Sequence, residues 1–290
     1  MHNFVIVTDS CSDLTPQLVQ EMELSVIHLK VLVEDKTYTN YPDWREIPAK
    51  AFYDLMRAEK TASTSAPSIG DFVHAFEPIL QAGRDILYLG FSSALSSTVS
   101  TGMLAAQELM EQYPDRKVLC VDTLCASLGQ GLFVRLVWEK KQAGASLEEV
   151  YQFARDLIPN LCHWFTVGDL HALQRGGRVS KTTAVVGSML QIKPILHVDD
   201  QGRLIKIGTI RGRKASIAAL KDKLKDAIID PENQTIFISH GDCEEEARYL
   251  ADLIAKEVPV KGFVLNHVGP VIGAHTGAGV IALFCVGKQR

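Results

Sequence analysis

The sequence predicts an α/β protein of two domains, and three observations support this. The chain has 290 residues, of which 47% are apolar and 22% charged, so it is long enough for two well-packed cores. In the first half, short apolar strands alternate with amphipathic helices, as in a parallel sheet. In the second half, a hairpin over residues 195–209 predicts a mixed sheet. We expect an N-terminal α/β domain (residues 1–160) packed closely against a C-terminal α/β domain (residues 161–290).

In the N-terminal domain, local signals mark most elements. Thr15-Pro16 begins a helix after the first strand, and Ser68 with Asp71 forms a capping box for another. The strands are expected at residues 4–8, 26–33, 85–91 and 117–122. The helices are expected to begin near residue 15 and to cover residues 47–57, 68–81, 95–112, 125–143 and 146–158.

The C-terminal domain ends in a segment with unusual composition. Residues 269–279 hold four glycines around His275 and Thr276, between two apolar strands. Bare backbone N–H groups on such a frame predict a site loop for an anionic or strongly polar group. The strands are expected at residues 163–167, 195–198, 203–209, 235–239, 262–266 and 280–284. The helices are expected at residues 169–174, 180–191, 213–229 and 244–257.

Composition and missing motifs exclude several classes of protein. Thirty basic residues against thirty-four acidic ones give a net charge of −4, which argues against a nucleic-acid surface. No signal peptide and no apolar run of roughly 20 residues is present, so a cytoplasmic location is expected. The six cysteines lack metal-ligand spacing and predict free thiols. Phosphate-loop, dinucleotide and nucleophile-elbow motifs are absent, and we expect no metal or cofactor.

Two hydroxyl clusters, at residues 63–68 and 92–98, are candidates for an anion site. The second lies at the carboxyl end of a strand and before a helix, where ligands of parallel sheets and anions bind. Thr64 and Ser93 are equally typical of turn and cap residues. Arg178 follows Gly176-Gly177 and supplies either a ligand charge or a surface ion pair. No carboxylate that would orient His275 as a base can be assigned from the sequence.

A series of motifs resembles those of the DegV family of fatty-acid-binding proteins, in order and over almost the whole chain. They are TDS (8–10), TSAPS (64–68), SSALSST (92–98), SLGQG (127–131), LQRGGRV (173–179), IKPIL (192–196), RGRKA (211–215) and VIGAHTG (271–277).

The resemblance implies a carrier of one long-chain fatty acid, buried in the second domain. The carboxylate is then expected at Thr64, Ser93, Arg178, His275 and Thr276. Such proteins carry the acid to a separate ATP-binding fatty acid kinase subunit, which phosphorylates the carboxylate, so the chain itself is expected not to be an enzyme. Transient contact with a membrane surface is expected as well. About a dozen buried methylenes at roughly 0.8 kcal/mol each would supply most of the affinity.

The small and apolar residues of the helix expected at 180–191 suit an extended acyl chain. We predict that the tail contacts Val186, Met189, Leu190 and Ile192, although the same pattern is typical of a core helix. Four residues depart from the family pattern and bear on chain-length preference and kinase pairing. They are Ser97 in place of Gly, Ala66 in place of Gln, Gln191 in place of Asn and Ala278 in place of Pro.

Two other functions stay open. The first is an acyl hydrolase or transferase with Ser93 or Thr64 as nucleophile and His275 as base. The second is a partner-docking module that uses the basic hairpin and helix over residues 203–225. A charge run of this kind is also typical of a solvated face.

Overall fold

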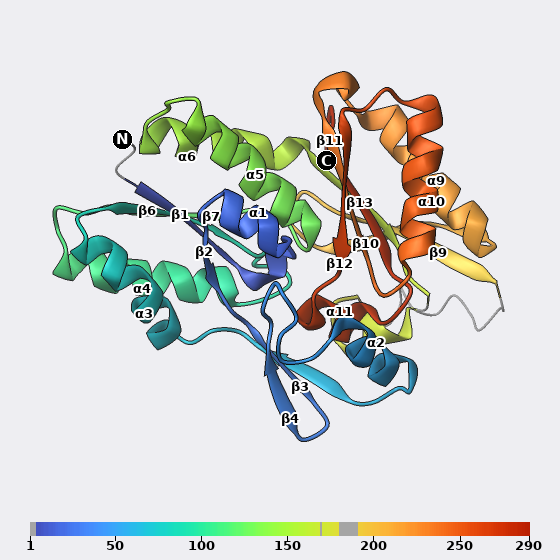
Figure 1. Ribbon diagram of the computed structural model, residues 1–290, viewed down its shortest axis with the longest axis horizontal. Coiled ribbons are helices and arrows are strands. Elements are labelled where there is room, and N and C mark those ends of the chain that lie inside the picture. Colours follow the sequence, from blue (N-terminus) through green and yellow to red (C-terminus); the bar gives the residue numbers. More distant parts are fainter. Residues whose placement is uncertain (1–3, 169, 180–190) are drawn as a thin grey trace.

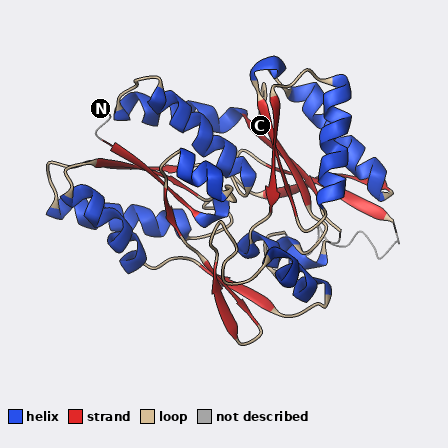
Figure 2. Cartoon of the chain, viewed as in Figure 1, coloured by secondary structure: helices blue, strands red, loops and turns tan. Residues whose placement is uncertain are grey.

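The computed structural model describes residues 4–168, 170–179 and 191–290 and confirms the predicted α/β class. Two lobes lie side by side in Figure 1, each built on its own sheet. Helices cover the sheets, as Figure 2 shows by colour. None of the helices in the described ranges is long and apolar enough to cross a bilayer.

The first lobe holds a parallel sheet with strand order β2-β1-β6-β7. Its strands are β1 (Phe4–Asp9), β2 (Ser25–Ile27), β6 (Asp85–Gly90) and β7 (Val118–Asp122). Its helices are α1 (Pro16–Glu21), α3 (Ile69–Gln81), α4 (Thr98–Gln112), α5 (Leu128–Gln142) and α6 (Leu147–Leu157). Every residue of β1 is buried, as expected for a strand covered on both faces. The capping box at Ser68 and Asp71 is confirmed, and Ser146 with Glu149 forms a second one before α6.

The prediction of one strand over residues 26–33 is wrong. β2 ends at Ile27, and the chain then leaves the parallel sheet, with the Leu29 N–H donating to Ser10 Oγ over 3.0 Å. The following residues form an antiparallel sheet of their own, in the order β4-β3-β5, which projects at the bottom of Figure 1. Its strands are β3 (Lys30–Val33), β4 (Lys36–Thr39) and β5 (Ala62–Ser65), and α2 (Ala49–Arg57) lies between the last two. Thr64 therefore lies on a strand.

The second lobe holds the mixed sheet that the hairpin predicts, in the order β10-β9-β8-β13-β11-β12. Among its described strands, β11 and β12 pair in parallel and the other neighbours pair antiparallel. The strands are β8 (Leu161–Thr166), β9 (Ile192–Val198), β10 (Leu204–Arg211), β11 (Thr235–His240), β12 (Gly262–His267) and β13 (Ile281–Val286). The helices are α7 (His171–Arg175), α9 (Arg213–Ala227), α10 (Glu244–Glu257) and α11 (Pro270–Thr276). The helix predicted at 180–191 lies outside the described residues, except for Gln191.

The glycine-rich segment is not the loop that its composition predicts. Its first part is α11, which begins with Pro270 in the first turn. Gly273 within α11 lies against α2, where a Cβ atom would come within 2.7 Å of Tyr53 Oη and 2.8 Å of a Phe52 ring carbon. Glycine is needed here because the helix of one lobe packs tightly on the other lobe.

The two lobes share one hydrophobic cluster, which includes Phe133 of α5 and Phe284 of β13. Polar bonds cross the same interface: Tyr53 Oη donates to the Val268 carbonyl over 2.7 Å. Asn266 of β12 donates to the Asp13 carbonyl over 2.7 Å. Within the first lobe, Ser127 at the start of α5 donates to the Asp13 carboxyl over 2.6 Å, and burial raises the pKa of Asp13 to about 7. The lobes pack closely, and the boundary near residue 160 stays a prediction.

Candidate ligand-binding site

A cavity of about 210 Å³ lies between the lobes and is lined by side chains from both. Most of its wall is apolar. Phe165 of β8 and Ala282 of β13 are direct partners in the antiparallel register, and Phe284 lies one row further along the same face. Val198 and Leu204 of the β9–β10 hairpin extend this wall. At the wall, Phe165, Phe284 and Val198 are each less than 10% exposed, at 7%, 3% and 3%.

At the polar end of the cavity, one hydrogen bond joins the two lobes. Thr64 Oγ1 on β5 lies 2.9 Å from His275 Nε2 on α11, although 211 residues separate them. Gly176 after α7 makes room for this imidazole, because a Cβ there would lie 2.3 Å from His275 Nδ1. The sequence indicated a helix stop at Gly176, and the structure adds close packing against a site residue.

His275 is neutral at physiological pH. Burial, and after it the nearby Arg178 charge, lower its pKa to about 4. In the tautomer that carries the proton on Nε2, the imidazole donates to Thr64 Oγ1, and the Thr64 hydroxyl can then donate to a ligand oxygen.

Arg178 brings a permanent positive charge to the same end. The half-buried guanidinium donates to the Leu95 carbonyl over 3.2 and 3.3 Å and to the Gly176 carbonyl. Burial lowers the pKa of Arg178, and the group stays a cation because its ordinary pKa is above 12. Among the described residues its bonded partners are carbonyl oxygens, so the charge is not neutralised by a described carboxylate.

The serine run at residues 92–98 reaches the cavity through different residues from the one predicted. Ser93 is exposed, its N–H donates to Asp122 Oδ1 over 3.2 Å, and it does not line the cavity. Ser96 and Ser97 do line it, directly before the N-terminus of α4. The serine motif thus identifies a turn that does reach the cavity. Which of its hydroxyls lines the cavity depends on the conformation of the turn. The predicted role of Ser93 stays a prediction.

The remaining predicted residues have three different outcomes. Thr276 is buried, lines the cavity and donates to the Ile272 carbonyl over 3.3 Å. Val186, Met189 and Leu190 lie outside the described residues. Ile192 begins β9 and is half-buried, but it is not among the lining residues.

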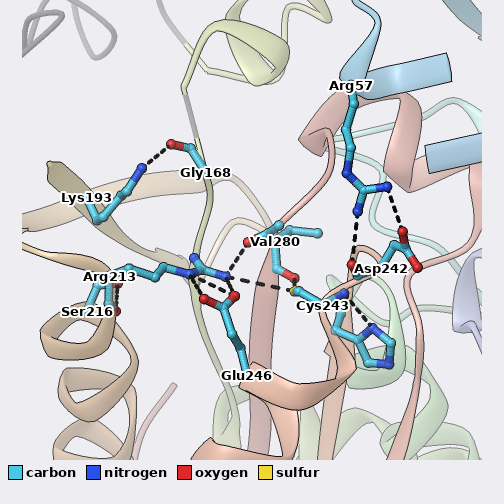
Figure 3. Close-up of polar contacts among 11 residues, drawn as sticks. Arg57, Gly168, Lys193, Arg213, Ser216, Asp242, Cys243, Glu246 and Val280 are labelled. Carbon is cyan, nitrogen blue, oxygen red and sulfur yellow. Dashed lines mark hydrogen bonds and ion pairs between the residues drawn. The ribbon is translucent and has the colours of Figure 1, made fainter. Parts of the chain in front are cut away.

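The basic hairpin and helix use part of their charge within the fold, as Figure 3 shows. Arg213 pairs with Glu246 of α10 over 2.7 Å and donates to the Gly279 carbonyl over 2.6 Å. Lys193 of β9, which lies outside the predicted docking segment, donates to the Gly168 carbonyl over 2.8 Å. Arg57 of the first lobe pairs with Asp242 of the second over 2.7 Å in the same view.

No group of metal-ligating side chains occurs within the described ranges.

The fold and the cavity define a class: two-lobed α/β proteins that enclose an apolar site between the lobes, with hydroxyls and a guanidinium at one end. The family model described as "Uncharacterised protein, DegV family" matches residues 3–288. The chain belongs to the DegV family.

Relatives agree with this assignment over their full length. A DegV domain-containing protein of Clostridium perfringens is 42% identical over 290 residues, which cover 100% of this chain and 99% of the relative. A solved DegV family protein from Thermus thermophilus, described as fatty acid binding, has a TM-score of 0.88 and 30% identity. The match covers 98% of this chain and 99% of that one. A DegV lipid-binding protein from Thermotoga maritima has a TM-score of 0.86, 29% identity and 100% coverage of both chains.

Proposed function

We propose that this protein binds one long-chain fatty acid, with the acyl tail along the β8–β13 wall and the carboxylate at the Thr64–His275 end. The observation that carries the proposal is the polarity of the cavity, which is apolar along its wall and holds hydroxyls and Arg178 at one end. Full-length relatives described as fatty acid or lipid binding support the same ligand class.

The two ends of the cavity would contribute differently. Each buried methylene contributes roughly 0.8 kcal/mol, so a long tail supplies most of the free energy of binding. The carboxylate would accept hydrogen bonds from Thr64 and from Ser96 or Ser97, while Arg178 balances its charge. The N-terminus of α4 adds a favourable dipole close to these serines.

We further propose that the protein presents the carboxylate to a separate ATP-binding kinase subunit in the cytoplasm. In support, the polar end is the more accessible one: Ser97 is exposed and Thr64 is half-buried, whereas the apolar wall is buried. A second protein would thus reach the carboxylate without access to the tail. Loading from a membrane surface by transient contact belongs to the same proposal.

Mass spectrometry of a solvent extract tests the ligand. Protein purified from a bacterial host is expected to carry about one long-chain acid per chain. The variant Ala282→Phe, which occupies space along the apolar wall, is expected to retain much less of it. An extract with no acyl species, from protein whose delipidated form also takes up no added acid, would contradict the proposal.

A coupled assay tests the presentation step separately. The loaded protein, ATP and the purified kinase subunit are expected to yield an acyl phosphate, measured as hydroxamate after trapping with hydroxylamine. If the protein binds the acid but no acyl phosphate forms, the proposed fatty acid binding is retained and the proposed role with a kinase subunit is contradicted. Co-sedimentation with anionic phospholipid vesicles tests membrane contact.

The Thr64–His275 hydrogen bond also favours a second candidate, an acyl hydrolase or transferase. Two features weaken His275 as a general base. Its pKa is lowered to about 4, and the charged group near it among the described residues is Arg178 rather than a carboxylate. Turnover of acyl esters that is lost in Thr64→Val would establish this candidate, and stoichiometric retention of an unchanged acid would exclude it.

A further inference from the structure

Two cysteines lie directly opposite each other on neighbouring strands of the second lobe. Cys162 of β8 and Cys285 of β13 are partners in the antiparallel register, and both are free thiols and fully buried. The Gly287 N–H donates to the Asn160 carbonyl over 2.8 Å, which makes the cysteines the next hydrogen-bonded pair along the ladder. The Cα atoms of such pairs are about 5.5 Å apart, a separation common among disulfides.

The two thiols interact and are not equivalent. The hydrogen bond from the Cys285 thiol lowers the pKa of Cys162, and the Arg290 charge lowers it further. The same bond, together with burial, raises the pKa of Cys285. A thiol with a lowered pKa beside a second cysteine is the arrangement found in pairs that oxidise reversibly.

A short backbone segment near the C-terminus separates the Cys162 thiol from solvent. This thiol donates to the Gln289 carbonyl over 3.2 Å, and Gln289 is itself exposed. A Cβ on Gly287 would lie 2.5 Å from Cys162 Sγ, so the backbone of residues 287–289 rests directly on the sulfur. Local opening of this short strip would admit a small oxidant without unfolding the lobe.

We propose that Cys162 and Cys285 form a thiol–disulfide site that hydrogen peroxide oxidises and a dithiol reduces. The Cys162 sulfur attacks a peroxide oxygen, the O–O bond breaks, and Cys162 becomes a sulfenic acid as water leaves. The Cys285 sulfur then attacks that sulfur, the S–S bond forms, and the S–O bond breaks. The oxygen leaves as a second water with the Cys285 proton. Two thiols lose two electrons, and one hydrogen peroxide is reduced to two waters.

The position of the pair connects it to the cavity. His163 and Phe284 follow and precede the two cysteines, and they line the cavity from the opposite face of the same strands. A disulfide would therefore cross-link the two strands that carry the cavity wall. The oxidation itself does not depend on the proposed function.

The test is a non-reduced peptide map of the full chain after treatment with hydrogen peroxide. We expect a Cys162–Cys285 peptide, with the loss of about 2 Da that accompanies a disulfide, before oxidation at Cys120 or Cys243. Those two thiols are half-buried and serve as internal controls. Dithiothreitol is expected to restore both free thiols. Oxidation first at Cys120 or Cys243, or no linked peptide at all, overturns the proposal.

Variants separate the roles of the two sulfurs. Cys285→Ser is expected to accumulate a sulfenic acid at Cys162 that dimedone captures, whereas Cys162→Ser is expected to leave Cys285 unmodified. Cys243→Ser is the matched control and is expected to form the disulfide at the wild-type rate. Equal dimedone labelling of Cys162 and Cys285 in the two variants contradicts the assignment. The peptide map of the wild-type chain tests the proposal even if one of these variants fails to fold.

Discussion

The two ends of the cavity are built in different ways. The apolar wall comes from neighbouring strands of one sheet, where register places Phe165, Ala282 and Phe284 on a common face. The polar end comes from β5, the turn after α7, the start of α4 and α11, which only tertiary packing brings together. The wall is thus regular, whereas the polar end combines side chains from four separate segments. Under the proposed function, the wall would hold the acyl tail and the polar end the carboxylate. Affinity should depend on the first and orientation on the second.

The strongest test of this contrast places the same bulk at both ends. Ala282→Phe fills the space of about four methylenes, so we expect a loss of about 3 kcal/mol, or roughly a hundredfold in Kd for a long-chain acid. Ala66→Phe at the polar end adds equal volume beside the half-exposed rim, where we expect a smaller loss. Displacement of a fluorescent fatty acid measures both. Equal losses would contradict the division of roles.

Removing the charge at the polar end should have the next largest effect. Arg178→Gln loses a charge-assisted hydrogen bond of about 2 kcal/mol, so we expect the Kd for the acid to rise roughly thirtyfold. The Kd for the corresponding fatty alcohol should change little. Arg175→Gln, on an exposed residue of α7, is the matched control. An equal effect of Arg178→Gln on the acid and the alcohol would show that Arg178 does not contact the carboxylate.

Thr64→Val keeps the shape of the side chain and removes its hydroxyl. We expect a loss of about 1 kcal/mol, or roughly fivefold in Kd, because one neutral hydrogen bond disappears. Ser65 lies on the other side of the same strand and is exposed, so Ser65→Ala is the control. Calorimetric titration with the acid resolves a difference of this size. An unchanged Kd for Thr64→Val would place the carboxylate elsewhere.

The smallest expected effect concerns pH. Since the pKa of His275 is lowered to about 4, the Kd should be nearly constant from about pH 6 to about pH 9, with Arg178 as the charged group among the described lining residues. A rise of about tenfold per unit above about pH 6.5 would instead identify His275 as the cation.

The same pKa gives a prediction for stability. The unfolded chain binds a proton at His275 more readily than the folded chain, so this group destabilises the fold as pH falls from about 6.5 toward 4. His275→Gln should therefore lose less stability than wild type over that range, measured by urea denaturation. A parallel pH dependence in both proteins would contradict the assignment of a neutral, buried imidazole.

Local chemistry explains what the sequence predicts well. Ser68 with Asp71 begins α3, Thr15 with Pro16 begins α1, and Gly202 closes the β9–β10 turn with φ of 75°. These signals act within a few residues, so they can be interpreted without knowledge of the fold. Thr64, Arg178, His275 and Thr276 are different, because local chemistry leaves their roles open and the family resemblance implies them as site residues. All four line one cavity.

Tertiary contacts explain what the sequence does not predict. Residues 26–33 are apolar except for His28 and Lys30 and contain no turn residue, so the pattern is typical of a single strand. The pairing of β3 with β4 and β5 separates residues 30–33 from β2. The glycines of residues 269–279 disfavour a helix locally, but packing of Gly273 on Tyr53 stabilises α11. The choice of Ser96 over Ser93 likewise depends on how the turn after β6 is folded.

The separation of Thr64 and His275 along the chain has a consequence for biosynthesis. A ribosome makes β5 long before α11, and contacts between such distant segments form late in folding. A nascent chain therefore holds an incomplete pocket until α11 has emerged. Under the proposed function, the protein could capture a fatty acid only after translation of nearly the whole polypeptide, and acyl loading would then report that synthesis and lobe assembly are complete.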